Sequence, residues 1–124
     1  MSKYHSRKVK YNGITFHSKK EAHRYAELLL LQRAGKITNL ELQKEFELIP
    51  SQYESYERYG KKGQRLKDGR RCVERAVKYI ADFCYMQDGK LVVEDTKGMV
   101  TTDYVIKRKL MLFIHGIKIS EIRG

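Results

Sequence analysis

Two runs of strand-forming residues meet at Asp88-Gly89, and this pattern constrains the fold more than any other feature of the 124-residue chain. The first run extends over residues 73–86 and the second over residues 91–97, and both are rich in β-branched and aromatic side chains. Asp-Gly is a preferred two-residue turn of β-hairpins. The sequence therefore predicts two antiparallel strands, in which each residue of one run has a defined neighbour in the other.

An aspartate interrupts each of these apolar runs. Strict alternation predicts one face of the first strand made of Val77, Tyr79, Ala81, Phe83 and Tyr85. Asp82 then lies on the opposite face, and alternation along the second strand projects Asp95 and Lys97 together near its C-terminal end. Two close carboxylates repel each other, and either a divalent cation or a salt bridge to a lysine would relieve the repulsion. Oxygen ligands favour Mg²⁺ over zinc, so the hairpin is a candidate magnesium site; the alternative is a solvated strand end with an incidental ion pair.

The remaining patterns predict two helices and two further strands. Ser18 and Glu21 form a capping box at the start of a helix that ends at Gly35. A second helix is expected to begin at one of residues 101–103 and to end at Gly116. Strands are expected over residues 37–49 and 117–122, and Asn12-Gly13 predicts a small hairpin near the start. Together these elements predict a single α/β domain over residues 1–124, with a mixed sheet in the order α-β-β-β-α-β.

A basic insert over residues 51–71 interrupts this order. It holds seven Lys or Arg, three tyrosines at positions 53, 56 and 59, and three glycines. We expect it to form a mobile loop or an extended hairpin tip. Its tyrosines would either stack on unpaired bases or pack over the edge of the sheet.

The composition suggests a polyanion as partner. The chain carries 26 Lys and Arg against 15 Asp and Glu, a net charge of +11, and nucleic acid is the commonest polyanion that such a domain meets. Simple solubility is the alternative reading of the charge. The two cysteines form no CxxC, which excludes a zinc finger, and no apolar run approaches the roughly 20 residues that cross a bilayer. With no apolar segment typical of a signal peptide, we expect a cytoplasmic protein that does not contact membranes.

The acidic hairpin resembles the core of the PD-(D/E)xK, or restriction-endonuclease-like, nucleases. The residues that carry this resemblance are Asp82, the motif Asp95-Thr96-Lys97 and Glu21 on a preceding helix, with Ala81 where the motif name has proline. More closely, residues 11–122 resemble a small phage-encoded family known as a domain of unknown function. The segments that match this family are residues 16–22, 79–83, 93–98 and 107–109, together with Gln43.

The resemblance implies a fold, a reaction and a set of site residues. The fold would be a restriction-endonuclease-like core, a mixed β-sheet flanked by helices. Asp82 and Asp95 would bind Mg²⁺, with Mn²⁺ as a substitute, and Glu21 would bind it directly or through water. Lys97 would orient or activate the water that hydrolyses a DNA phosphodiester. For Glu21 the capping box alone is an alternative explanation.

The implied partner is DNA, in phage recombination, replication or repair within the cytoplasm of a bacterial host. Branched or Holliday-junction DNA is the candidate substrate, and cleavage of a junction would require a homodimer. The residues assigned to nucleic-acid binding are Lys19, Lys20, Lys61, Lys62, Arg65, Arg70, Arg71 and Lys107. For Lys107 a solvated helix face is the alternative.

Two other functions fit the same sequence. One is a non-catalytic nucleic-acid-binding module in which the acids are structural. The other is an RNA-binding regulator that uses Gly60-Lys61-Lys62-Gly63, which is similar to the GxxG loop of KH domains. Because that loop should join two helices, and its neighbours here are tyrosine, arginine and glutamine, the regulator is the weaker of the two.

Overall fold

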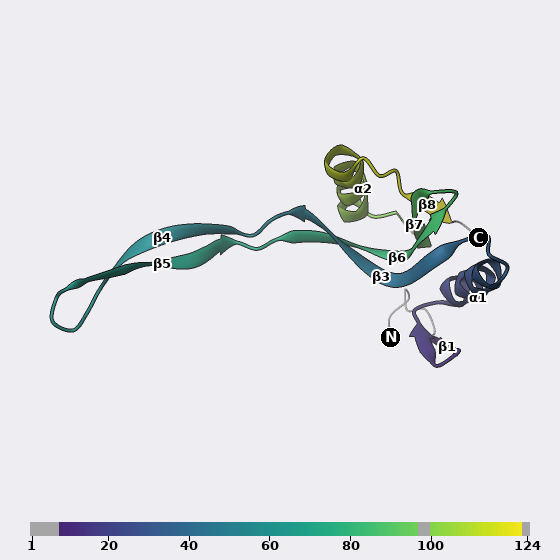
Figure 1. Ribbon diagram of the computed structural model, residues 1–124, viewed down its shortest axis with the longest axis horizontal. Helices are drawn as coiled ribbons and strands as arrows, with labels where there is room; N and C mark the ends of the chain where they lie inside the picture. Colours follow the sequence, from purple (N-terminus) through teal and green to yellow (C-terminus); the bar gives the residue numbers. More distant parts are fainter. Residues whose placement is uncertain (1–7, 97–99, 123–124) are drawn as a thin grey trace.

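A mixed four-stranded sheet lies between two helices, and a long two-stranded arm projects from it (Figure 1). The computed structural model describes residues 8–96 and 100–122. The strands of the sheet are β3 (Thr38–Ile49), β6 (Val77–Gln87), β7 (Lys90–Thr96) and β8 (Ser120–Ile122), in the order β3-β6-β7-β8. The first three pair antiparallel and β8 runs parallel to β7, so the sheet is mixed.

The predicted hairpin is confirmed as β6 and β7. Gln87 pairs with Lys90 across a turn in which Asp88 and Gly89 have φ values of 52° and 76°. Both residues are in the left-handed region that a type I′ turn requires, which Gly adopts freely and Asp tolerates. The turn sets the register of the two strands up to the pair Phe83–Glu94.

Both helices begin and end as their sequence signals predict. In α1 (Lys19–Arg33), the Ser18 hydroxyl accepts a hydrogen bond from the backbone N–H of Glu21 at 3.2 Å. In α2 (Thr102–His115), Thr101 accepts in the same way from the N–H of Tyr104 at 3.1 Å. Gly116 then ends α2 in the left-handed conformation at φ 68°. Each hydroxyl satisfies an N–H that the first helical turn leaves without a partner. Among the described residues, no helix is long and apolar enough to cross a membrane.

Each face of the sheet has its own apolar core. The core under α1 consists of Phe16, Ala22, Tyr25, Leu28, Ile37, Phe83 and Tyr85. The core under α2 consists of Leu48, Tyr79, Ala81, Cys84, Val93, Tyr104, Met111 and Ile119. The hairpin of β1 (Val9–Tyr11) and β2 (Ile14–Phe16) turns at Asn12-Gly13 as predicted and adds Phe16 to the α1 core.

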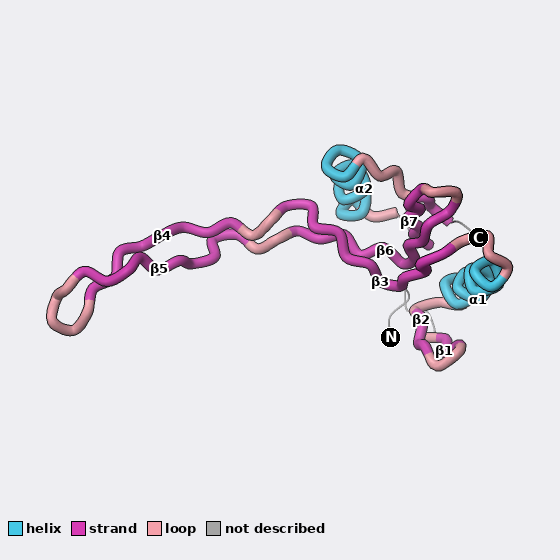
Figure 2. Tube along the Cα trace, in the orientation of Figure 1, coloured by secondary structure: helices cyan, strands magenta, loops and turns pink. Residues whose placement is uncertain are grey.

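The basic insert forms an arm, the extended hairpin that was one of its two predicted forms. Its strands are β4 (Gln52–Tyr59) and β5 (Arg65–Glu74), which continue outward from the ends of β3 and β6 (Figures 1 and 2). The arm reaches further than predicted, because strand pairing includes residues up to Glu74 and not only the insert over 51–71.

The predicted order α-β-β-β-α-β is wrong as a description of the whole chain. The observed order is β1-β2-α1-β3-β4-β5-β6-β7-α2-β8, with four additional strands in the two hairpins outside the sheet. The predicted strand over residues 73–86 also divides, because its first residues belong to β5 and the rest to β6. Alternation alone did not reveal this boundary, since Val73 continues the apolar pattern although it is exposed on the arm.

Candidate active site

Strands β6 and β7 separate at the position of the two aspartates. Within the described part of the chain, their ladder ends at the pair Phe83–Glu94, and Asp82 and Asp95 are the next residue on each strand. Beyond this point β6 continues beside β3, whereas β7 continues beside β8. We call this position the fork. The prediction that the hairpin brings Asp82 and Asp95 close together in register is consistent with this arrangement.

Asp95 is a buried carboxylate on the α2 side of the fork. Its side chain is 2% exposed, and the Tyr79 hydroxyl donates to its Oδ2 at 2.5 Å. Burial, together with this hydrogen bond, raises the pKa of Tyr79 well above its usual range. Tyr79 therefore stays a proton donor at every physiological pH and orients the carboxylate of Asp95.

Asp82 spans the fork with its side chain. Its Oδ2 accepts two hydrogen bonds from Thr96, one from the backbone N–H and one from the hydroxyl, each at 2.8 Å. Because the backbone ladder has ended here, the carboxylate of Asp82 takes the place of a strand partner for Thr96. This contact holds the last described residue of β7 against β6.

The face assigned to β6 from alternation is wrong beyond Ala81. Tyr79 and Ala81 belong to the α2 core, but Phe83 and Tyr85 belong to the α1 core. The change occurs at Asp82, where the β3–β6 ladder has Gln43 at φ 53° between its flanking pairs. A non-glycine residue in this conformation is uncommon and marks an irregularity that period-two counting cannot anticipate.

Helix α1 runs from the fork toward the Asp88-Gly89 turn. Near its C-terminal end, Gln32 Oε1 accepts from the N–H of Leu40, close to where β3 begins opposite Met86. Nearer its N-terminal end, Arg24 contacts Glu94, the residue of β7 that closes the ladder. The first turn of α1 is therefore the part of the helix closest to the fork.

Glu21 lies in that first turn and is 6% exposed. It precedes Arg24 by three residues, so it occupies the same side of the helix about 4.5 Å nearer the fork along the helix axis. Its N–H is bonded to Ser18, which confirms the cap. A capping glutamate does not need to be buried, however, and burial of this carboxylate keeps Glu21 a candidate ligand. Its predicted catalytic role stays a prediction.

Glu94 is a second buried acid on β7, directly before Asp95. It lies on the α1 side, 1% exposed, and Arg24 binds it through Nε at 2.8 Å and Nη2 at 2.6 Å. The Tyr85 hydroxyl also donates to Glu94. Burial and this hydrogen bond raise the pKa of Tyr85 to about 12. Glu94 lies on the face opposite Asp95, as alternation along β7 predicts, and its pairing with Arg24 over seventy residues leaves no local signal in the sequence.

The three predicted metal ligands, Glu21, Asp82 and Asp95, all lie among the described residues. Among residues 8–96 and 100–122, no three His, Cys, Asp or Glu side chains gather closely enough to hold a metal ion. Asp82 and Asp95 nevertheless offer carboxylate oxygens, the hard donors that Mg²⁺ prefers. Lys97, predicted to act on water, lies outside the described residues. The pair of aspartates therefore fits Mg²⁺ in chemistry, while the complete ligand set stays a prediction.

Lys107 lines the same cavity as Tyr79, whose hydroxyl binds Asp95. The cavity has a volume of about 250 Å³, and Lys107, Lys78 and Tyr79 are among the residues that line it. This position fits the predicted contact of Lys107 with a phosphate.

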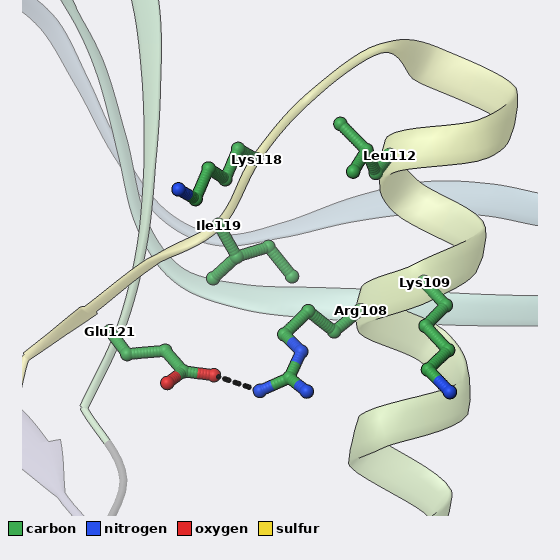
Figure 3. A pocket seen from close by; sticks show the side chains of 6 residues that line it. All are labelled: Arg108, Lys109, Leu112, Lys118, Ile119 and Glu121. Atoms are coloured by element: carbon green, nitrogen blue, oxygen red, sulfur yellow. Dashed lines mark hydrogen bonds and ion pairs between the residues drawn. The ribbon is translucent and has the colours of Figure 1, made fainter.

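The neighbouring Arg108 has another partner. It pairs with Glu121 at 2.9 Å in the groove between α2 and β8 (Figure 3), where Tyr104 donates to the same carboxylate at 2.7 Å. Arg108 is therefore a structural residue that fastens α2 to the last strand.

The other residues assigned to nucleic-acid binding fall in two places. Lys19 and Lys20 belong to the first turn of α1, near the fork. Lys61, Lys62, Arg65, Arg70 and Arg71 lie on the arm, away from the fork. The structure thus separates a basic region near the aspartates from a second one on the arm.

Comparison with known proteins gives one match. Residues 1–120 match a protein family that is described as "Protein of unknown function (DUF1064)". No curated protein and no solved structure matches the chain.

Proposed function

The chain belongs to the DUF1064 family of proteins of unknown function, and we propose that it is a metal-dependent endonuclease that hydrolyses phosphodiester bonds in DNA. The observation that carries the proposal is the fork, where Asp95 is buried and Asp82 is the first residue past the last β6–β7 pair. Keeping two carboxylates at one end of an interrupted ladder is costly unless a cation offsets their charge.

In this proposal Asp82 and Asp95 hold Mg²⁺, or Mn²⁺ in its place. When bound, the ion supplies positive charge next to the scissile phosphate, where negative charge develops during hydrolysis. Tyr79 keeps Asp95 oriented through its hydrogen bond, and Thr96 does the same for Asp82. These contacts fix one oxygen of each carboxylate, which is the kind of support that keeps ligands in place.

The chain's own residues also supply the remaining roles. Lys97 would orient the attacking water or take up its proton, and Glu21 would contribute a further carboxylate from α1. The water oxygen forms a bond to phosphorus, the bond from phosphorus to one sugar oxygen breaks, and that oxygen takes up a proton. Lys107, in the cavity beside Tyr79, would pair with a phosphate of the bound strand.

The biological role that we propose is processing of DNA in phage recombination, replication or repair. Branched or Holliday-junction DNA is the candidate substrate within this role. Its cleavage would require two coordinated sites and hence a homodimer. The net charge of +11 supports a DNA partner because it would raise the association rate and the affinity for the phosphate backbone.

A second function is favoured by one specific observation, the exposed basic arm. A nucleic-acid-binding module could use this arm and keep the buried acids only as structural residues. Such a module would bind DNA with a steep dependence on salt, without metal-dependent turnover.

Cleavage of end-labelled DNA separates the two functions. Linear duplex, flap and four-way junction substrates would be incubated with the wild-type protein in Mg²⁺ or in EDTA, and binding would be measured in parallel. We expect cleavage in Mg²⁺ alone, together with binding in both conditions. Binding without cleavage of any substrate, by protein with an intact circular dichroism spectrum, would overturn the nuclease and support the binding module.

A further inference from the structure

We propose that the β4–β5 arm binds duplex DNA far from the fork. The substrate must then include duplex DNA that extends from the cleaved bond along the arm. The inference rests on the proposed function for the position of cleavage. It goes beyond that function because it names a second contact region and the form of DNA that occupies it.

The arm has no core of its own. All eight residues of β4 are exposed, and β5 has only Leu66 and Gly69 half-buried. A two-stranded hairpin in water is marginally stable, so burial of apolar surface does not explain why the chain extends this far. What the arm presents instead is charge.

The charge of the arm is concentrated at its far end. Residues 58–67 contain five Lys or Arg and no Asp or Glu. Asp68 offsets one of these five cations by pairing with Arg65 at 2.8 Å, and nearer the base Glu54 pairs with Arg71 at 3.0 Å. The far end is therefore the strongest site for a polyanion on the arm, and it would repel the same segment of a second copy.

The tip that carries Lys61 and Lys62 is an ordered turn. The N–H of Gly63 donates to the carbonyl of Gly60 at 2.9 Å, and the N–H of Gly60 donates to the carbonyl of Gln64 at 2.8 Å. The side chain of Gln64 accepts from the N–H of Lys62 at 3.1 Å. The two lysines occupy the corners of this turn and are exposed. Their backbone is held before any ligand binds, which lowers the ordering cost of binding.

The tyrosines of the arm already have partners on their rings. The guanidinium of Arg70 lies 4.1 Å from the ring centroid of Tyr53, and that of Arg71 lies 4.6 Å from the ring centroid of Tyr56. On the ring face that each arginine covers, an unpaired base would have to displace that arginine in order to stack. This arrangement favours a duplex, which needs cations for its phosphates, over a single strand, which needs free aromatic faces.

The dimensions of the arm also fit a duplex. The major groove of B-DNA admits a two-stranded β-ribbon. Arg65, near the tip, precedes Asp82 by seventeen residues, which is at most about 56 Å of extended strand at roughly 3.3 Å per residue. At about 3.4 Å per base pair this distance corresponds to at most about 16 base pairs. We therefore expect contacts with DNA roughly one to one and a half helical turns from the cleaved bond.

Two duplexes of about 12 and about 40 base pairs test the inference. The arm variant replaces Lys61, Lys62 and Lys67 with alanine, and the control variant replaces Lys36, Lys90 and Lys118, which are exposed on the body of the protein. Binding would be measured in EDTA at several salt concentrations, and cleavage in Mg²⁺. For the arm variant we expect at least about a 10-fold loss of affinity for the long duplex and a smaller loss for the short one. The salt slope should fall by up to about 2.7, at about 0.9 for each phosphate that the variant no longer neutralises.

The outcomes for the arm and for the nuclease are distinguishable. If the arm variant binds and cleaves both lengths like the control variant, the arm inference is wrong and the nuclease stands. If no protein cleaves DNA but only the arm variant loses affinity for the long duplex, the nuclease is wrong and the arm inference stands. Greater loss of single-stranded DNA or RNA binding than of duplex binding would overturn the choice of duplex. A change of oligomeric state in the arm variant alone, measured by analytical ultracentrifugation, would assign the arm to a second copy instead.

Discussion

The two neighbouring acids of β7 have different partners and different consequences for the protein. Asp95 faces α2 and is held by a neutral tyrosine hydroxyl, whereas Glu94 faces α1 and is neutralised by Arg24. A buried carboxylate bound by an arginine through two nitrogens is an ion pair that holds two elements together. The buried carboxylate of Asp95, which the Tyr79 hydroxyl orients, is the ligand that we propose for Mg²⁺. At the level of residues, we infer a structural role for Glu94 from its ion pair, while the chemical role of Asp95 is the one proposed above.

Removal of Arg24 should destabilise the protein strongly. The Arg24→Ala variant would leave Glu94, 1% exposed, as an uncompensated buried charge, and we expect a loss of about 3–5 kcal/mol in the free energy of unfolding. Urea denaturation at neutral pH measures this loss. The matched control is Glu27→Ala, which removes the exposed partner of Arg24 at 3.2 Å and should cost less than about 1 kcal/mol. Equal losses in the two variants would refute the structural role of Glu94.

The Tyr85 hydroxyl predicts how stability depends on alkaline pH. Its pKa is raised to about 12 in the folded protein, against about 10 in an unfolded chain. Between these values the folded state holds a proton that the unfolded state has released, so stability falls as pH rises. In Tyr85→Phe this contribution is absent, and the free energy of unfolding should fall less steeply, by up to about 1.4 kcal/mol per pH unit.

Urea denaturation of wild type and Tyr85→Phe at several pH values between about 9.5 and about 11.5 checks this slope. The variant should be less stable than wild type near pH 8, because Glu94 loses a hydrogen-bond donor. Its deficit should then shrink as pH rises. A constant deficit across the range would mean that Tyr85 titrates in the folded protein as it does in the unfolded chain.

Among the elements, those with local signals were predicted well. Ser18 and Thr101 cap their helices, Gly116 ends α2, and Asp88-Gly89 turns between β6 and β7, because each of these features depends on a few adjacent residues. The face change along β6 was not predictable. It coincides with the left-handed backbone of Gln43 on β3, which lies between the pairs that flank Asp82, and this pairing is a property of the sheet and not of the local sequence of β6.

The arm shows why exposed strands are hard to predict. Alternation reveals a strand when one face is buried, but all of β4 is exposed and carries polar residues on both faces. From the sequence alone, residues 51–71 could therefore form either a mobile loop or an extended hairpin. The β4–β5 backbone ladder holds the arm together, and cross-strand contacts between tyrosine and arginine add to it, with Gly69 leaving room for the ring of Tyr56.

The fit of Tyr56 over Gly69 gives a test of the arm as an element. A Cβ at Gly69 would lie 2.4 Å from the Tyr56 ring, so Gly69→Ala should displace the ring and weaken the arm. We expect amide hydrogens of β4 and β5 to exchange at least about 10-fold faster in the variant, with little change in β6 and β7. The control adds Gly69→Ala to Tyr56→Ala, where the methyl group meets no ring and should leave exchange as it is in Tyr56→Ala alone. Unchanged exchange in Gly69→Ala would show that this contact does not stabilise the arm.

For the whole molecule, the two hairpins and two cores explain where a site can form. The α1 and α2 cores lie on opposite faces of the sheet, and the fork is where the odd-numbered residues of β6 change from the α2 core to the α1 core. Sequence reasoning identified Asp82 and Asp95 because aspartate inside a strand is unusual. It missed Tyr79 and Thr96, which hold them, because a tyrosine and a threonine in strands have no unusual signal. The basic surface divides between the fork and the arm, so catalysis and much of the binding are proposed for different places.

The central claim is that the protein cleaves DNA at the fork. The cleavage rate of Asp95→Asn tests it most directly, because a contaminating nuclease would not respond to this substitution. Single-turnover cleavage of the preferred DNA would be compared among wild type, Asp95→Asn and Asp88→Asn in Mg²⁺. Asparagine can still accept the hydrogen bond from Tyr79, and Asp88→Asn makes the same chemical change at an exposed turn. We predict a loss of at least about 100-fold in Asp95→Asn with DNA binding retained, and wild-type activity in Asp88→Asn. Cleavage by folded Asp95→Asn at the wild-type rate would contradict the account.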